Sequence, residues 1–116
     1  MKEVGKIQTS YWSSGGKLTE GLVINGSLEG IQKKWFENGE IEWVHEYVND
    51  NLYGVCVGYY ENGNLDYKND WKDNRYHGLV QWWAESGERD LIRTLKDDIH
   101  NGVYVDFNHY NYRIHE

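Results

Sequence analysis

The sequence has no proline and a single cysteine, Cys56. Proline commonly starts helices and occupies turns, so other residues must make the turns of this chain, and its 13 glycines can supply them. One cysteine cannot close a disulfide within the chain, which is typical of a reducing compartment. No apolar run approaches the roughly 20 residues that a membrane-spanning helix needs. We therefore expect neither a disulfide-stapled nor a membrane-spanning protein.

Basic residues are also scarce. The 12 Lys and Arg are outnumbered by 19 Asp and Glu, which gives a formal net charge of −7 at pH 7. Binding to nucleic acid and to anionic membranes relies on clustered Lys and Arg, so we expect no direct nucleic-acid binding and no membrane insertion, and anionic membrane surfaces are disfavoured. The excess of carboxylates instead favours a protein partner with a basic surface.

The start of the sequence shows no leader. Residues 1–6 are followed by no apolar run, so we expect no signal peptide and a cytoplasmic protein. Aromatic residues make up 16% of the chain, which is too many for a disordered protein, and they favour strands over helices.

The sequence repeats itself every 24 residues. Three columns recur at this spacing: Gly30, Gly54, Gly78 and Gly102; Gly15, Gly39, Gly63 and Gly87; and the aromatics Tyr11, Trp35, Tyr59, Trp83 and Phe107. A period of this length indicates a repeat architecture. Four units fit, 6–29, 30–53, 54–77 and 78–101, followed by a partial unit at 102–116, and together they predict a single domain over 1–116.

Two turns divide each unit into two strands. Glu37-Asn38-Gly39 and its equivalents lie between apolar segments, which is a strong hairpin signal. The second turn reads as longer and ends on the first glycine column. The sequence therefore predicts an all-β fold: a single-layer, twisted antiparallel meander of about ten strands built from 24-residue β-hairpin repeats.

The register of each hairpin can be predicted from the alternation of side chains. A three-residue loop with a left-handed glycine would pair Phe36 with Glu40 and keep the strong apolar positions on one face. A slip of one residue would turn Trp35 to the opposite face from Trp43. Without such a slip, the predicted core face is Ile31, Trp35, Ile41, Trp43, Tyr47, Val55, Tyr59, Leu65, Tyr67, Trp71, Leu79, Trp83, Leu91 and Leu95.

The third unit resembles a known family. The run Tyr59-Tyr60-Glu61-Asn62-Gly63-Asn64-Leu65, followed by Tyr76-His77-Gly78, is similar to the MORN repeat in its bacterial and phage variant. The resemblance extends from residue 6 to about residue 112, and the altered first and last units suit capping repeats. It implies hairpin strips in an elongated sheet. It also implies a function among scaffolds, membrane-apposed proteins and immunity-type inhibitors, since this variant is often described as an antitoxin component.

A second set of aromatics predicts the partner-binding surface. Trp12, Phe36 and Tyr60 recur at one position, and Trp82 lies nearby, all pointing away from the predicted core face. Exposed Trp and Tyr often anchor protein interfaces. The alternative is that the sheet covers them. Glu37, Glu61 and Glu85 flank them at successive hairpin tips, where acidic residues also suit the turns themselves.

No constellation of residues predicts catalysis. The five histidines lack the paired spacing and the cysteine partners of a zinc site, and neither Cys56 nor Ser86 belongs to a recognisable triad. We therefore expect no metal, no cofactor and no enzymatic activity.

The interpretation that follows is a non-catalytic binding module. It would inhibit or neutralise one protein partner by occlusion, as an antitoxin, an immunity protein or a phage anti-defence inhibitor does. The alternatives are a self-associating or membrane-apposed scaffold, using the open edge strands for homo-oligomers, and sequestration of a small ligand such as a nucleotide.

Overall fold

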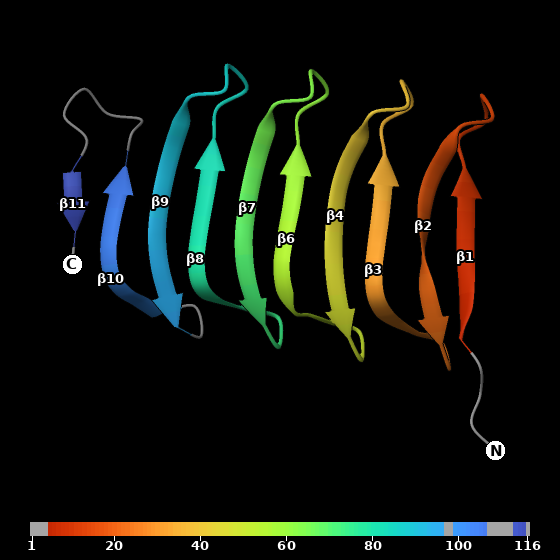
Figure 1. Ribbon diagram of the computed structural model, residues 1–116, viewed down its shortest axis with the longest axis horizontal. Helices are drawn as coiled ribbons and strands as arrows, with labels where there is room; N and C mark the ends of the chain where they lie inside the picture. The colour runs from red at the N-terminus through yellow and green to blue at the C-terminus, as the bar shows by residue number, and fades with distance from the viewer. Residues whose placement is uncertain (1–4, 97–98, 107–112, 116) are drawn as a thin grey trace.

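The computed structural model describes residues 5–96, 99–106 and 113–115, and within them all regular secondary structure is β-strand. Each strand pairs antiparallel with the next in one meandering sheet, except that the short β5 extends the pairing of β4 (Figure 1). The strands are β1 (Lys6–Tyr11), β2 (Lys17–Ile24), β3 (Ser27–Trp35), β4 (Ile41–Val48), β5 (Asn51–Leu52), β6 (Gly54–Tyr59), β7 (Leu65–Lys72), β8 (Arg75–Trp83), β9 (Arg89–Lys96), β10 (Ile99–Asp106) and β11 (Arg113–His115). The predicted all-β meander is confirmed.

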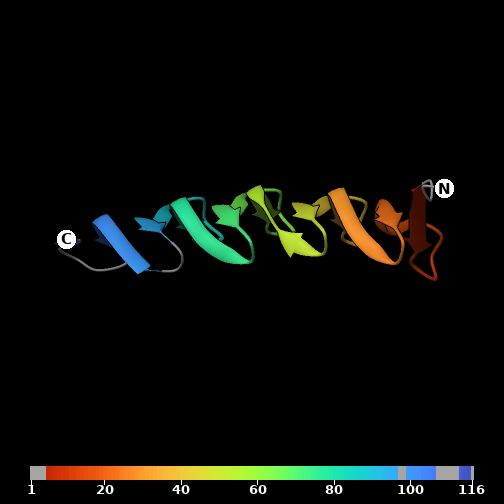
Figure 2. The same ribbon diagram turned by 90° about the horizontal axis from the view of Figure 1, so that it is seen from below.

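The sheet is one layer thick. Its Cα atoms span 54 × 37 × 12 Å, and the edge-on view shows strands side by side with nothing stacked on them (Figure 2). Because packed sheets lie about 10 Å apart, a second layer would make the molecule roughly twice as thick. No other described element therefore covers either broad face of the sheet.

The hairpin tips along one edge of the sheet have the predicted three-residue loop. The amide of Phe36 donates to the carbonyl of Glu40 at 2.8 Å, and the amide of Gly39 donates to the carbonyl of Phe36 at 3.0 Å. Gly39 is left-handed, with φ of 93°. Bonds of the same pattern close the loops that end at Gly15, Gly63 and Gly87. The pairing of Phe36 with Glu40 is thus confirmed.

The turns at the opposite edge are shorter than the sequence predicts. Asn49 and Asp50 both have positive φ, as the two central residues of a type I′ turn do, and the strands pair again immediately beside them. The column glycine lies beyond the turn, where the chain bends: Gly54 has φ of 82° and Gly78 has φ of 107°. The prediction of a long second turn is therefore wrong. A two-residue turn reverses the chain, and a separate bend at the glycine follows it.

Adjacent turns at this edge are also tied to one another. The amide of Asp50 donates to the carbonyl of Leu28 at 3.1 Å, and the Asp50 carboxylate accepts from the Leu28 amide at 2.6 Å. Asn74 repeats the same pair of bonds with Leu52, at 3.1 and 2.7 Å. These bonds clamp each unit to the next one.

A β-bulge in each hairpin overturns the predicted core face. Trp35 pairs with Ile41, but Lys34 already pairs with Trp43, so Glu42 is an extra residue in β4. The same shift occurs at Leu18, Asp66 and Asp90. One extra residue reverses the alternation beyond it. Trp35 and its column therefore share a face with Ile31 and lie opposite Trp43.

The two faces consequently have different compositions. We call one the aromatic face, after its rings: Trp43, His45, Tyr47, Tyr67, Trp71, Tyr76 and Trp82. The other is the aliphatic face, after a row that recurs every 24 residues: Ile7, Ile31, Val55 and Leu79. The side chain of Leu95 and the repeat positions 107–112 lie outside the described part of the structure.

The buried residues belong to the aromatic face. Cys56 and Val80 are fully buried, and Gln32 and Asn69 are 7% and 3% exposed. They pair with one another or with residues that carry the rings, as Gln32 pairs with His45 and Asn69 pairs with Cys56 and Val80. The sheet therefore builds its small core on one side of itself, beneath its own aromatic side chains.

Candidate functional site

The largest group of aromatic contacts surrounds a hollow at the centre of the aromatic face. We call it the central hollow. The Trp71 and Tyr76 rings lie 4.2 Å apart at 36°, and Tyr76 meets Trp82 edge-on at 5.8 Å and 86°. The lining residues come from strands β4, β5, β7 and β8: His45, Leu52, Tyr67, Asn69, Trp71, Tyr76 and Trp82. The hollow is thus lined mainly by aromatic rings that also contact one another.

The Tyr67 ring occupies space that is open because Gly58 has no side chain. Gly58 pairs with Tyr67, and a Cβ built on Gly58 would lie only 2.1 Å from the ring. The ring therefore lies flat across the glycine, as the side chain of Gln32 lies across Gly21. Glycine at these two positions is needed for space rather than for an unusual φ.

His45 and Tyr67, which both line the central hollow, have strongly shifted pKa values. The His45 ring stacks on Trp43 at 4.2 Å and 13°, and its Nε2 lies 2.6 Å from the Tyr67 hydroxyl. Burial lowers the pKa of His45 from 6.5 to about 4, because a low-dielectric environment disfavours the charged ring. Burial likewise raises the pKa of Tyr67. Both groups are uncharged at neutral pH.

The buried amides satisfy the backbone where the strands bend. Gln32 donates through Nε2 to the carbonyls of Leu22 at 2.8 Å and Glu29 at 3.1 Å. The Asn69 side-chain oxygen accepts from the amide of Gln81 at 3.0 Å. These bonds replace ladder bonds that the glycine bends interrupt. Both amides therefore have a structural role.

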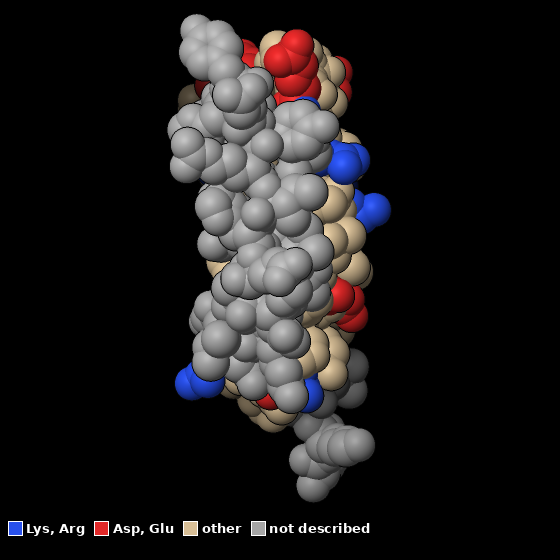
Figure 3. Space-filling view, turned by 90° about the vertical axis from the view of Figure 1, so that its left-hand side faces the viewer, with Lys and Arg blue, Asp and Glu red and all other residues tan. Residues whose placement is uncertain are grey.

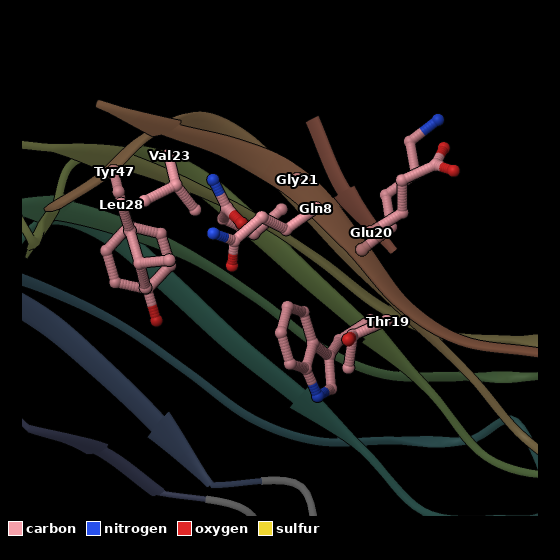
Figure 4. Close-up of a pocket in the computed structure, with 10 residues that line it drawn as sticks. Gln8, Thr19, Glu20, Gly21, Val23, Leu28 and Tyr47 are labelled. Atoms are coloured by element: carbon pink, nitrogen blue, oxygen red, sulfur yellow. The ribbon is translucent and has the colours of Figure 1, made fainter. Parts of the chain in front are cut away.

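A second hollow lies on the same face toward the N-terminus. The side chains of Tyr47, Leu28 and Val23 lie together on one side, Gln8 extends into the space, and Glu20 points away from it (Figure 4). Its volume is about 230 Å³, against about 160 Å³ for the central hollow. Small-molecule sites usually enclose about 300–1,000 Å³, so neither hollow suits a whole nucleotide.

The aliphatic row is the most exposed apolar feature of the sheet. Ile7 is 63% exposed, Ile31 and Val55 are 49% exposed, and Leu79 is 45% exposed. Carboxylates interrupt it, since Ile31 pairs with Glu46 and Val55 pairs with Asp70 on the strands between its members. Members of the row lie two strands apart, about 10 Å by the usual spacing. The row therefore runs from β1 to β8 with its members on alternate strands, and Glu46 lies between Ile31 and Val55 because β4 lies between β3 and β6.

The predicted binding aromatics lie between neighbouring hairpin tips. The Trp12 ring nitrogen donates to the Trp35 carbonyl at 3.1 Å, and the Tyr60 hydroxyl donates to the Trp83 carbonyl at 2.6 Å. Trp12, Phe36, Tyr60 and Trp82 are all half-buried. Alternation from Lys34 and Gly58 puts them on the aromatic face, so they do not form a second face apart from Trp43 and Tyr67.

The predicted acidic residues are brought to one edge. Glu37, Glu61 and Glu85 are exposed at successive tips, and the Glu85 carbonyl accepts from the side chains of Asn62 and Asn64 at 3.0 and 2.9 Å. Seen from the β11 end, however, the visible flank carries acidic and basic side chains interspersed (Figure 3). The described charges on that flank form no single patch.

Among the described residues, no group of His, Cys, Asp and Glu is arranged to hold a metal ion. No helix in the described part of the chain is long and apolar enough to cross a membrane. Cys56 is fully buried, and burial raises the pKa of its thiol, which keeps it protonated and unreactive.

Sequence reasoning missed two features of these surfaces. His45 and Tyr76 were not singled out, although each occupies a position that faces the rings once the bulge is included. Three members of the exposed row, Ile31, Val55 and Leu79, were predicted to lie on the core face. The acidic residues Glu42 and Asp66, inserted between apolar neighbours, were the available signal for the bulge.

Comparison of the chain with known protein families, with curated proteins and with solved structures finds no match.

Proposed function

We propose that the chain is a non-catalytic protein-binding module that inhibits or neutralises one protein partner by covering a surface of that partner. The observation that carries the proposal is the aliphatic row on an uncovered face, with Val55 and Ile31 each half exposed. Exposed apolar side chains accompanied by polar groups are typical of interaction surfaces. The carboxylates between them suit a partner surface that presents basic as well as apolar side chains.

The shape of the sheet supports occlusion as the mechanism. A strip one layer thick and 54 Å long can lie along a groove or an active-site cleft and exclude other molecules. Glu37, Glu61 and Glu85 at the tips would then contact the rim of that cleft. We also propose that the repeat is of the MORN type, that the protein acts in the cytoplasm, and that it belongs with antitoxins, immunity proteins or phage anti-defence inhibitors.

A structural role, besides partner binding, is proposed for four half-buried aromatics: Trp12, Phe36, Tyr60 and Trp82. Two of them bond to the neighbouring tip, so they hold adjacent units together and keep the face flat. Substitution of Phe36, which is exposed in part, separates the two roles. If Phe36→Ala weakens partner binding while the unfolding free energy is unchanged, Phe36 is a binding residue.

The experiment that tests the proposal uses two valines. Val55 lies in the aliphatic row and is 49% exposed, whereas Val48 is 42% exposed beside a turn outside the row. Immobilised wild type, Val55→Glu and Val48→Glu would each be mixed with an extract of the source cells. We expect one protein to be retained by wild type and Val48→Glu but lost with Val55→Glu, and its purified activity to be abolished by one equivalent of the chain. Equal retention by all three, or retention without inhibition, would contradict the proposal.

A scaffold that self-associates is a second candidate, and one observation favours it. The edge strand β1 carries Ile7 and Tyr11, which are 63% and 60% exposed, and it has no neighbour on its outer side in the described sheet. Edge strands can pair with a second copy. Light scattering distinguishes the two candidates: a monomer at high concentration would exclude the scaffold.

A further inference from the structure

We propose that the central hollow of the aromatic face binds the ammonium group of a lysine side chain, in its methylated form, presented by a protein partner. This site lies on the face opposite the aliphatic row. Its test is therefore independent of the test of the function proposed above. Three properties of the hollow support this assignment: the arrangement of its rings, the charge of its lining and its size.

The rings give the hollow the walls that a cation needs. Trp71, Tyr76 and Trp82 all line the hollow, with Tyr76 4.2 Å from Trp71 and at 86° to Trp82. Aromatic faces carry a negative quadrupole and attract cations that approach within about 6 Å of the ring centre. The same attraction operates elsewhere in this molecule. Lys17 lies 5.5 Å from the centre of the Trp35 ring, and Arg89 lies 5.5 Å from that of Trp83.

The lining is electrically suited to a cation. None of the seven described lining residues is a lysine or an arginine, and His45 stays neutral because burial lowers its pKa to about 4. The whole chain carries a net charge of −7, which draws cationic groups toward it. A cation entering the hollow therefore meets no like charge from these residues.

The polar groups of the hollow favour a methylated ammonium over a bare one. A bare lysine ammonium is strongly hydrated and needs hydrogen-bond acceptors to replace its water. The Asn69 side-chain oxygen already accepts from the Gln81 amide, and the Tyr67 hydroxyl already bonds to His45. A trimethylated group needs no acceptor and gains from contact with the rings.

The size of the hollow points to a side chain rather than to a free ligand. Its volume of about 160 Å³ is well below that of a typical small-molecule site. One end of a long side chain would fit there while the rest of the partner stays outside. The expected ligand is therefore a lysine side chain of a protein partner. Binding of free choline is measured as the alternative.

The test compares matched probes on the wild-type protein. The indole signals of Trp71 and Trp82 would be followed by NMR during titration with a glycine-flanked peptide that carries trimethyl-lysine. The control is the same peptide with the neutral tert-butyl isostere of that side chain, and free choline is the third probe. We expect the cationic peptide to bind about 5- to 30-fold more tightly than the isostere, which is the range of a desolvated cation–π contact.

Two variants locate the site. Trp82→Leu should weaken binding of the cationic peptide about 5-fold or more. Tyr47→Leu, which removes a ring from the other hollow on the same face, should leave the affinity unchanged. If Trp82→Leu fails to fold, the isostere comparison on the wild type still decides the matter. Equal affinity for the neutral isostere, or no shift of the two indole signals, would overturn the proposal. Choline binding as tightly as the peptide would overturn its assignment to a side chain.

Discussion

Val55 and Cys56 are adjacent in the sequence and lie on opposite faces of the same sheet, one 49% exposed and the other fully buried. The difference cannot come from depth in the fold, because the sheet has only one layer. It arises because rings and amides lie flat across the aromatic face, over glycines such as Gly58 and Gly21. The aliphatic row has no comparable cover. One face of the sheet is thus its own core, and the other is available to a partner.

The largest expected effect comes from filling the space that a ring uses. Gly58→Ala would put a Cβ 2.1 Å from the Tyr67 ring, so the ring must move and its contacts are lost. We expect the unfolding free energy to fall by about 2–3 kcal/mol, as overpacking does elsewhere. Gly16→Ala is the matched control, since its Cβ would meet nothing within 4 Å. Chemical denaturation measures both, and equal stability of the two variants would mean that the aromatic face is not packed.

Two valines test the contrast between the faces with identical chemistry. Val80 is fully buried on the aromatic face, and Val55 is half exposed in the aliphatic row. Val80→Ala should cost about 1–2 kcal/mol, because it removes buried methyl groups and leaves a cavity. Val55→Ala should change the unfolding free energy by less than about 0.5 kcal/mol. A large loss from Val55→Ala would show that something covers the aliphatic face.

The aromatic face should also make stability depend on pH through His45. The folded state lowers the pKa of His45 from 6.5 to about 4, so the unfolded chain takes up a proton first as the pH falls. Stability from the neutral ring is therefore present above pH 6.5 and lost between 6.5 and 4. We expect a loss of about 1–2 kcal/mol, discounted because the ring is partly exposed.

Equilibrium unfolding at a series of pH values measures this term, and His45→Gln provides the control. The variant should show a flatter pH dependence between pH 6.5 and 5, where most carboxylates remain ionised. Parallel curves for wild type and variant would mean that the ring is not held neutral.

The smallest expected effect is the loss of stability when a hydrogen bond between neighbouring hairpin tips is removed. Tyr60→Phe removes the hydroxyl that donates to the Trp83 carbonyl at 2.6 Å and leaves the ring in place. A single hydrogen bond of this kind contributes about 1 kcal/mol, so we expect a loss of that size in thermal or chemical unfolding. Partner binding should be unaffected. Unchanged stability together with weaker partner binding would instead show that Tyr60 is a binding residue.

The fold was largely predictable, because the 24-residue period and the Glu-Asn-Gly loops act locally. The Phe36–Glu40 pairing followed from turn chemistry alone. The assignment of faces was not predictable in the same way, because one inserted residue reverses it. The bulge at Glu42 sets which residues of β4 share a face with Trp35, and the chain bends again at Gly54, which has a positive φ. Alternation carries no information about either.

The predicted core residues depended on the face assignment. Ile31 and Val55 were assigned to the core, whereas they are half exposed. The predicted binding rings Trp12 and Tyr60 are occupied with bonds to the next tip. Single columns were identified correctly, but which columns share a face depends on pairings between strands.

The most direct test of the difference between the faces is the rate of thiol labelling in the native protein. The natural thiol of Cys56 should be protected, because it is fully buried and burial raises its pKa. A thiol placed next to it, by Val55→Cys in a Cys56→Ala background, should react at a rate within about 10-fold of the unfolded chain, since the side chain it replaces is half exposed. Protection of both thiols would mean that the aliphatic face is covered. Rapid labelling of Cys56 would mean that the aromatic face is no core, and either result would contradict the account.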